Sequence, residues 1–282
     1  MASRAIHPPV LLFLVFVSLI DLPRRVLRKG ASLVAPRGSL AESVWIGARL
    51  GVLDRDGVHR LDERYYAGGK EGEHIDYEGD AHNTRGLFDW EKPVVARWFA
   101  DRGRVLVLAA GGGREVLALR RLGIAADGFE CHPGLVAAAN DLLARQGLVG
   151  DVRVVPRDAA PETETRYGGV IVGWSAYTLV QGRDSRVAML RGLHALVESG
   201  SPVLVSFFYR DGSPFRHGVI ARLGNALRRL HGAEPLEEGD TLGPNFMHLF
   251  TEDEIRAELR EGGFDPVFYS TEGTGHAVGV AI

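Results

Sequence analysis

The sequence contains one cysteine, Cys131, among its 282 residues. A single cysteine excludes a disulfide within the chain and a zinc site built from several cysteines. This usage is typical of a reducing compartment, so we expect a cytoplasmic protein. The formal net charge is only −3. The chain therefore lacks the basic excess of nucleic-acid-binding proteins, and we expect no nucleic-acid partner.

Motifs of hydrolases and metal sites are also missing. No G-x-S-x-G sequence is present, which argues against a serine hydrolase. His217, His231 and His248 lack paired-ligand spacing, so we predict no metal site. With 45% hydrophobic and 24% charged residues, the composition is that of an ordinary globular protein. The length predicts one large domain, alone or with appendages.

The N-terminal apolar run is short. Val10 to Ile20 is apolar except for Ser18, and these 11 residues are followed by several basic ones. A helix of this length covers about 16 Å, roughly half of the hydrocarbon core of a bilayer. Three interpretations stay open for residues 1–30: a helix packed on the domain or a partner, a membrane-surface segment through residues 6–29, or a signal peptide.

Residues 31–88 form a separate region in our interpretation. We expect a linker with one helix near Ala41 to Leu50, followed by a polar, glycine-containing loop over residues 62–83. Tyr65, Tyr66 and Tyr77 make this loop unusually aromatic.

From residue 89 the chain alternates between strand and helix patterns. Asp89 is expected to cap the first helix. The predicted strands cover residues 104–109, 125–130, 152–156, 170–174 and 202–209, and the predicted helices cover residues 114–122, 133–146 and 183–198. Such alternation indicates βαβ units and a parallel sheet with helices on both faces.

The C-terminal part follows another pattern. Thr251 and Glu254 form a capping box that predicts a helix over residues 251–262. The strand-like runs 266–270 and 276–282 are too close for a helical crossover, so they predict an antiparallel hairpin. We therefore predict an α/β fold: a doubly wound, mostly parallel seven-stranded sheet with one antiparallel strand near the C-terminus. An insertion, residues 211–247, contains an amphipathic helix with an apolar side, Val219, Ile220, Leu223, Leu227 and Leu230.

The first strand leads into a glycine-rich loop, Ala109 to Glu115 (AAGGGRE). Its three glycines allow a sharp turn and a close approach of the backbone to a ligand. The following helix offers free N–H groups at its start. Glu130 ends the second strand, where a carboxylate can accept hydrogen bonds from both hydroxyls of a ribose. Together these features predict a nucleotide-type cofactor.

Two cofactors compete for this site. The dinucleotide fingerprint requires a third glycine three residues after Gly113, where this sequence has Val116. S-adenosylmethionine (SAM) has a ribose and an adenine but no pyrophosphate, so it tolerates this difference. Asp158, after the third strand, can accept a hydrogen bond from the exocyclic amine of adenine.

These features together resemble class I SAM-dependent methyltransferases over about residues 90–282. The resemblance implies a Rossmann-like methyltransferase fold, SAM as cofactor, and methyl transfer to an oxygen, nitrogen or carbon atom of a small-molecule acceptor. The family usually has an acidic residue and a glycine where this chain has Val107 and Ala109. We expect Glu115, or a residue of the segment 82–91, to replace the missing acid.

The resemblance also implies roles for aromatic residues. Trp174 and Tyr177 are expected to lie against the methionine end of SAM, whose sulfonium an aromatic face attracts. In similar enzymes the segment before the first strand folds over the cofactor, which makes His82 a candidate general base. Tyr65, Tyr66 and Tyr77 are then expected to line the acceptor pocket.

The predicted organisation has three parts: residues 1–30, an extension and cap over residues 31–88, and a methyltransferase domain over residues 89–282. The predicted catalytic residues are His82 and Tyr177. The predicted cofactor-binding residues are Ala109, Gly111, Gly113, Glu115, Glu130, Asp158 and Trp174. Two other classes stay open: another nucleotide-cofactor enzyme (an NAD-dependent oxidoreductase or an aminopropyltransferase) and a non-catalytic interaction protein with this fold.

Overall fold

The computed structural model describes residues 38–67, 75–148, 152–210, 212 and 214–282. The predicted N-terminal segment 1–30 lies outside these residues. The chain divides into two compact units. Among the described residues, the core unit lies within 63–210 and 248–282, and the insertion unit within 38–62 and 211–247. In the described part of the chain, residues 38–62 group with the insertion and residues 75–88 with the core unit. The predicted functional division, with residues 31–88 as an extension and cap, stays a prediction.

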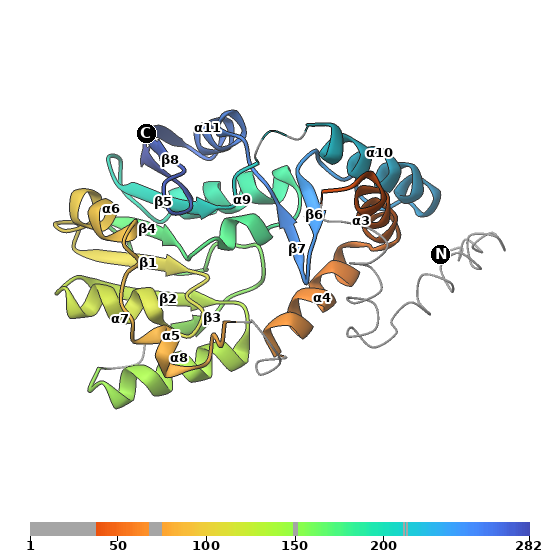
Figure 1. Cartoon of the computed structure of the whole chain (residues 1–282). Helices are drawn as coiled ribbons and strands as arrows, with labels where there is room; N and C mark the ends of the chain where they lie inside the picture. Colours follow the sequence, from red (N-terminus) through yellow and green to blue (C-terminus); the bar gives the residue numbers. More distant parts are fainter. Residues whose placement is uncertain (1–37, 68–74, 149–151, 211, 213) are drawn as a thin grey trace. The chain divides into compact units, whose positions relative to one another are not determined.

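A seven-stranded sheet forms the centre of the core unit (Figure 1). The strand order is β3-β2-β1-β4-β5-β9-β8. The five strands β1 to β5 run parallel, and β9 pairs antiparallel with both β5 and β8. The strands are β1 Arg104–Leu108, β2 Ala125–Glu130, β3 Val152–Val154, β4 Gly169–Val172, β5 Pro202–Phe207, β8 Phe264–Ser270 and β9 Gly275–Ala281. This arrangement confirms the predicted fold class, with its single antiparallel strand near the C-terminus.

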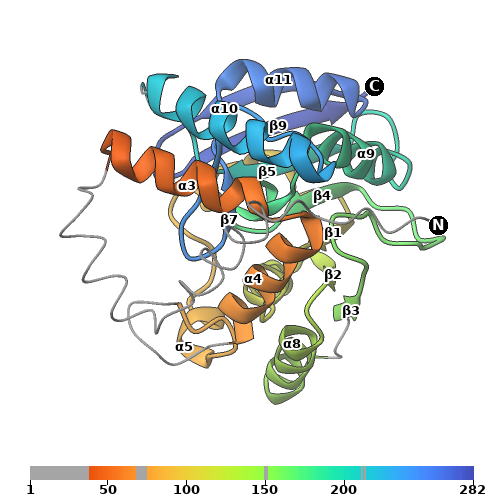
Figure 2. The ribbon, with the colours of Figure 1, turned by 90° about the vertical axis from the view of Figure 1, so that its right-hand side faces the viewer.

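Helices cover both faces of this sheet. On one face, Val95 of α6, Val116 of α7 and Leu142 of α8 belong to one apolar layer. On the other face, Leu190 of α9 and Leu259 of α11 belong to a second layer. Figure 2 shows α9 and α11 on the side of the sheet opposite to α8. The core-unit helices are α5 Asp80–Asn83, α6 Glu91–Trp98, α7 Arg114–Arg121, α8 Pro133–Arg145, the short 3₁₀-helix η1 Ala176–Leu179, α9 Arg183–His194 and α11 Glu252–Glu261.

Two local predictions in the first part of the chain are wrong. Asp89 does not cap α6: the N-cap residue is Trp90, and the side chain of Asp89 is 98% exposed and pairs with Lys92. The predicted loop over residues 62–83 is partly helical, because α4 (Arg55–Ala67) continues through Ala67 and α5 follows at residues 80–83. Few apolar residues mark α4, and only Val58 is among its buried hydrophobic residues, so the helical periodicity is weak in the sequence.

The insertion unit is built on two packed helices, α3 (Leu40–Val52) and α10 (Pro214–His231). Both correspond to helices that the sequence predicts. Gly51 allows their close approach, since a Cβ atom there would lie 2.8 Å from the Cβ of Leu227. Leu230 is 65% exposed and lies off the buried side of α10, which corrects its predicted place. The sequence did not reveal the two-stranded sheet of β6 (Asp240–Leu242) and β7 (Phe246–His248).

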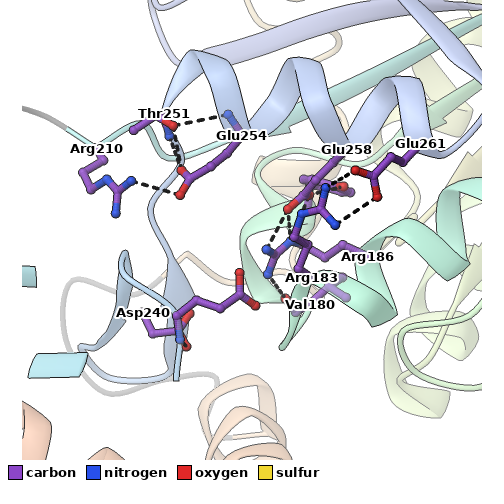
Figure 3. Close-up of polar contacts among 11 residues, drawn as sticks. Val180, Arg183, Arg186, Arg210, Asp240, Thr251, Glu254, Glu258 and Glu261 are labelled. Atoms are coloured by element: carbon purple, nitrogen blue, oxygen red, sulfur yellow. Dashed lines mark hydrogen bonds and ion pairs between the residues drawn. The ribbon is translucent and has the colours of Figure 1, made fainter. Parts of the chain in front are cut away.

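The predicted capping box at the start of α11 is present. The Thr251 hydroxyl accepts a hydrogen bond from the Glu254 amide, and the Glu254 carboxylate accepts one from the Thr251 amide (Figure 3). Arg210 pairs with the same carboxylate at 2.9 Å. Within the described part of the chain, no helix combines the length and the apolar character needed to cross a membrane.

Candidate functional site

A cavity opens at the carboxyl ends of the parallel strands in the core unit. It encloses about 870 Å³, including space that is open to solvent. The sheet order changes direction between β1 and β4, and ligands of such sheets bind at this switch point. The lining residues come mainly from the ends of these strands and the loops after them: Leu108, Ala109, Gly111, Glu130, Cys131, His132, Val155, Pro156, Arg157, Asp158, Val172 and Trp174.

The glycine-rich loop after β1 forms one wall of this cavity. Ala109 and Gly111 line it, with φ angles of 54° and 53° in the left-handed region. A Cβ atom at Gly111 would meet nothing within 4 Å. Gly113 does not line the cavity; it precedes α7 with φ 92°, and a Cβ atom there would lie 3.2 Å from the Cβ of Ala139. Gly113 thus serves the packing of α7 near α8.

Glu130 is the buried carboxylate of the cavity. It ends β2, and its side chain is held by two backbone amides: Oε2 accepts a hydrogen bond from Gly111 N at 2.9 Å, and Oε1 accepts one from His132 N at 2.9 Å. A carboxylate oxygen can accept more than one hydrogen bond. Each oxygen of Glu130 therefore keeps capacity for a ligand hydroxyl while its position is fixed.

The loop after β3 contributes Asp158 to the cavity lining. Its φ of 59° is unusual for a residue other than glycine, although aspartate tolerates this region better than most residues. Cys131 also lines the cavity, but burial, followed by the charge of Glu130, raises the pKa of its thiol to about 12. This thiol is protonated at neutral pH and is a poor nucleophile.

Aromatic rings form a further wall of the cavity. Tyr66, Tyr77 and Trp174 line it. The ring centroids of Tyr66 and Tyr77 are 5.4 Å apart, and Phe88 packs on Trp174 at 4.8 Å. Tyr65 is not a lining residue and packs edge-on against Tyr66 at 5.2 Å. Burial raises the pKa of Tyr77 to about 12, so this wall presents neutral aromatic faces.

Solved structures that are similar in fold to this chain include SAM-dependent methyltransferases. One from Methanosarcina mazei has a TM-score of 0.54 and 15% identity, with 70% of this chain and 99% of that chain covered. SAM-bound CalS10, an amino pentose methyltransferase from Micromonospora echinaspora, has a TM-score of 0.53 and 14% identity, with 76% of this chain and 100% of that chain covered. The CcbJ methyltransferase from Streptomyces caelestis has a TM-score of 0.52 and 16% identity, with 73% of this chain and 98% of that chain covered.

The chain has the class I SAM-dependent methyltransferase fold. At the level of sequence, no protein-family model and no curated protein matches it.

Within the methyltransferase fold, Tyr177 does not reach the cavity. Its side chain is 1% exposed, its hydroxyl donates to Glu258 Oε2 at 2.7 Å, and its ring stacks on Phe250 at 5.2 Å. Burial raises the pKa of Tyr177 well above its usual value. Arg186 also binds Glu258, as Figure 3 shows. Tyr177 therefore lies in the core and not at the predicted catalytic position. The reason is that η1 directs its side chain toward α11.

His82 lies behind the aromatic wall. Its ring is 5.4 Å from that of Tyr77 and 6.3 Å from that of Trp174, and it is not a lining residue. Burial, and then the charge of Arg114, lowers its pKa. The imidazole is therefore neutral at neutral pH. In this position it supports two rings of the wall.

A buried charged cluster beneath Trp174 was only partly visible in the sequence. Glu115 Oε1 accepts hydrogen bonds from Arg114 at 2.6 Å and from Trp174 N at 3.1 Å. Arg114 also forms a two-bond ion pair with Glu91, at 2.6 and 2.7 Å. The sequence pointed to Glu115 and to the segment 82–91, which contains Glu91, as replacements for the missing acid, but it gave Arg114 no role. The adjacency of Arg114 to the glycines was a usable signal, whereas Glu91 reaches the site through a contact between distant segments.

Val107 occupies the strand position where the family usually has an acid. Its side chain is fully buried in the apolar layer that contains residues of α6 and α7. No group of three or more histidine, cysteine, aspartate or glutamate side chains suited to a metal ion occurs among the residues that the structure describes.

Proposed function

We propose that this protein is a SAM-dependent methyltransferase that acts on a small-molecule acceptor. The observation that carries the proposal is Glu130, a buried carboxylate held at the end of β2 beside the glycine-rich loop, in a cavity at the carboxyl ends of the parallel strands. The methyltransferase fold supports the assignment, and SAM is the cofactor named for one of the similar structures.

The cavity residues suit the parts of SAM. In this proposal Glu130 accepts hydrogen bonds from both ribose hydroxyls. The open space at Gly111 lets a ligand approach the loop backbone. Asp158, beside apolar lining residues, is our candidate acceptor for the adenine amine. Trp174 and Tyr77 offer aromatic faces to a sulfonium.

When bound, SAM supplies a methyl group made electrophilic by the adjacent sulfonium. The task of the chain is to hold the acceptor in line with that group and to exclude water. The aromatic and aliphatic residues that line the cavity exclude water from it. A general base is required only if the acceptor must lose its proton early, and His82 lies outside the cavity lining.

The first experiment is calorimetric titration with SAM, S-adenosylhomocysteine (SAH) and NAD. We expect SAM and SAH to bind the wild type saturably. Glu130→Ala removes hydrogen bonds to a charged group, and we expect it to weaken binding about tenfold or more. Glu164→Ala, at an exposed position outside the cavity lining, is the control and should bind like the wild type.

NAD is included for a structural reason. In dinucleotide-binding folds the third glycine permits close packing of helix and strand. Here Gly128 on β2 permits this close packing of helix and strand, since a Cβ atom at position 128 would lie 3.0 Å from Val116. Val116 alone therefore does not exclude a dinucleotide. Binding of NAD without SAM would replace the proposal with a dinucleotide enzyme, and a folded protein that binds neither would indicate a non-catalytic role.

Methyl transfer is then assayed with labelled SAM and candidate acceptors. Amino sugars come first, because two similar structures are an amino pentose methyltransferase and a sugar N-methyltransferase. Transfer above the no-acceptor background would establish the enzyme class. Absence of transfer to amino sugars, with SAM bound, would direct the screen to other acceptor classes.

A further inference from the structure

The buried cluster beneath the cavity consists of Glu91, Arg114 and Glu115. All three side chains are at least nine-tenths buried, with residue exposures of 3%, 2% and 5%. Arg114 is held on both sides: its guanidinium pairs with both carboxylates, and it lies 3.9 Å from the ring centroid of Phe88. The cluster joins the start of α6 to the start of α7.

N–H donors surround both carboxylates, and at Glu91 they oppose the burial that raises its pKa. Glu91 accepts hydrogen bonds from both terminal nitrogens of Arg114 and from the amide of Phe88. Glu115 accepts from Arg114 and from the amide of Trp174. Each of these partners is an N–H donor, and donors of this kind favour the charged form of a carboxylate. Two carboxylates and one guanidinium carry one excess negative charge.

This excess charge lies close to the cavity. Glu115 is separated from the cavity wall by one hydrogen bond, because Trp174, whose amide it accepts at 3.1 Å, is a lining residue. The aromatic face of Trp174 itself attracts cations. Because the cluster is buried, water screens its charge less than it screens a surface charge. This part of the cavity therefore favours positive charge.

We infer that the Glu91–Arg114–Glu115 cluster makes the cavity selective for a cationic ligand and raises its affinity for SAM relative to SAH. The inference rests on the proposed function. SAM and SAH share the same nucleoside and amino-acid parts, and they differ by the methyl group and the positive charge of the sulfonium. Methyl transfer removes that charge, so the cluster favours the reactant over the product and assists product release.

The test is the ratio of the SAH and SAM dissociation constants, measured by calorimetry on the wild type, Glu115→Gln and Glu91→Gln. Both substitutions keep the side-chain shape and remove one negative charge. We expect Glu115→Gln to lower the affinity for SAM relative to SAH about tenfold, the effect of losing one nearby unit charge. Glu91→Gln should act in the same direction with a smaller effect, since Glu91 does not contact Trp174 N.

The matched control is Glu258→Gln. Glu258 is 1% exposed and pairs with buried Arg186, so this variant also removes a carboxylate charge from a buried ion pair. Neither residue lines the cavity. We expect a lower melting temperature and an unchanged SAM-to-SAH ratio. The control separates the effect of charge near the cavity from general loss of stability.

The outcomes distinguish the inference from the proposed function. If the folded wild type binds neither ligand, the proposed function fails. If the wild type binds both and Glu115→Gln weakens SAM and SAH equally, the cluster is only structural and the inference is overturned. Should Glu115→Gln not fold, as judged by its melting curve, Glu91→Gln decides: an unchanged ratio in that variant contradicts the charge argument.

Discussion

Gly112→Ala provides a sharp test of the packing around the cavity. The φ angle of Gly112 is not in the left-handed region, unlike those of its neighbours Gly111 and Gly113. Backbone conformation alone therefore ranks Gly112 as the most replaceable of the three. The structure predicts the opposite. A Cβ atom at Gly112 would lie 2.2 Å from Tyr77 O and 2.3 Å from Asn83 Nδ2.

The stability cost of Gly112→Ala depends on the neighbouring residues that must move. Asn83 is 2% exposed, and its Nδ2 donates to Tyr77 O at 2.8 Å and to Gly79 O at 3.0 Å. Relief of the clash requires the segment 77–83 to shift, which breaks these two hydrogen bonds. Overpacking costs about 1–3 kcal/mol and each lost hydrogen bond about 1 kcal/mol. We expect a total of about 3–5 kcal/mol, or a fall in melting temperature of roughly 6–20 °C.

Gly111→Ala is the comparison variant. It places a side chain at φ 53° but in open space, so only conformational strain of about 1–2 kcal/mol is expected. The melting temperature of each variant is measured without ligand, and SAM binding is measured on separate folded samples. Because Tyr77 lines the cavity, Gly112→Ala should also weaken binding. A Gly112→Ala protein as stable as Gly111→Ala, with unchanged SAM affinity, would refute the packing argument.

Three further predictions concern residues away from the glycine-rich loop. Tyr177→Phe should cost about 1–2 kcal/mol of stability in chemical denaturation, because it removes the hydroxyl that donates to Glu258, and it should leave any methyl-transfer rate unchanged. Burial lowers the pKa of His276 from its usual 6.5, so the unfolded chain takes up a proton first. The free energy of unfolding should fall as the pH drops below about 6.5, and His276→Asn should reduce this fall between pH 7.5 and 5.5. Thr251→Ala removes the capping box of α11 and should lower stability by about 1 kcal/mol in the same assay.

The alternation of strands and helices was predictable because most of the buried parallel strands are short apolar runs bounded by turn residues. β1, β4 and β5 are buried along nearly their whole length, so their composition is distinctive. The five residues between the last two runs, Thr271 to Gly275, are too few for a crossover. The antiparallel β9 follows from that geometric limit. In these elements, local pattern and tertiary burial agree.

The site was harder to predict where direction or distance decides a role. Trp174 and Tyr177 are three residues apart, yet one lines the cavity and the other is buried against Phe250. The left-handed φ of Ser175, 54°, turns the chain between them, and aromatic composition does not reveal this turn. Glu91 pairs with Arg114 across 23 positions of sequence. A contact of that kind depends on the packing of α6 beside α7 and leaves no local signal.

The buried cluster can carry a net negative charge that a single acid at position 107 could not keep. A lone carboxylate in the apolar layer around Val107 would lose its hydration, and desolvation would raise its pKa and favour the neutral form. One carboxylate with one arginine would stay ionised but carry no net charge. Two carboxylates on one guanidinium meet both requirements, because Arg114 stabilises the ionised form of each while one negative charge remains. Burial still acts against that charge and raises the pKa of Glu91, and Glu115 adds to this effect. A cationic ligand above Trp174 would oppose both effects, so cation binding and ionisation of the cluster should stabilise each other.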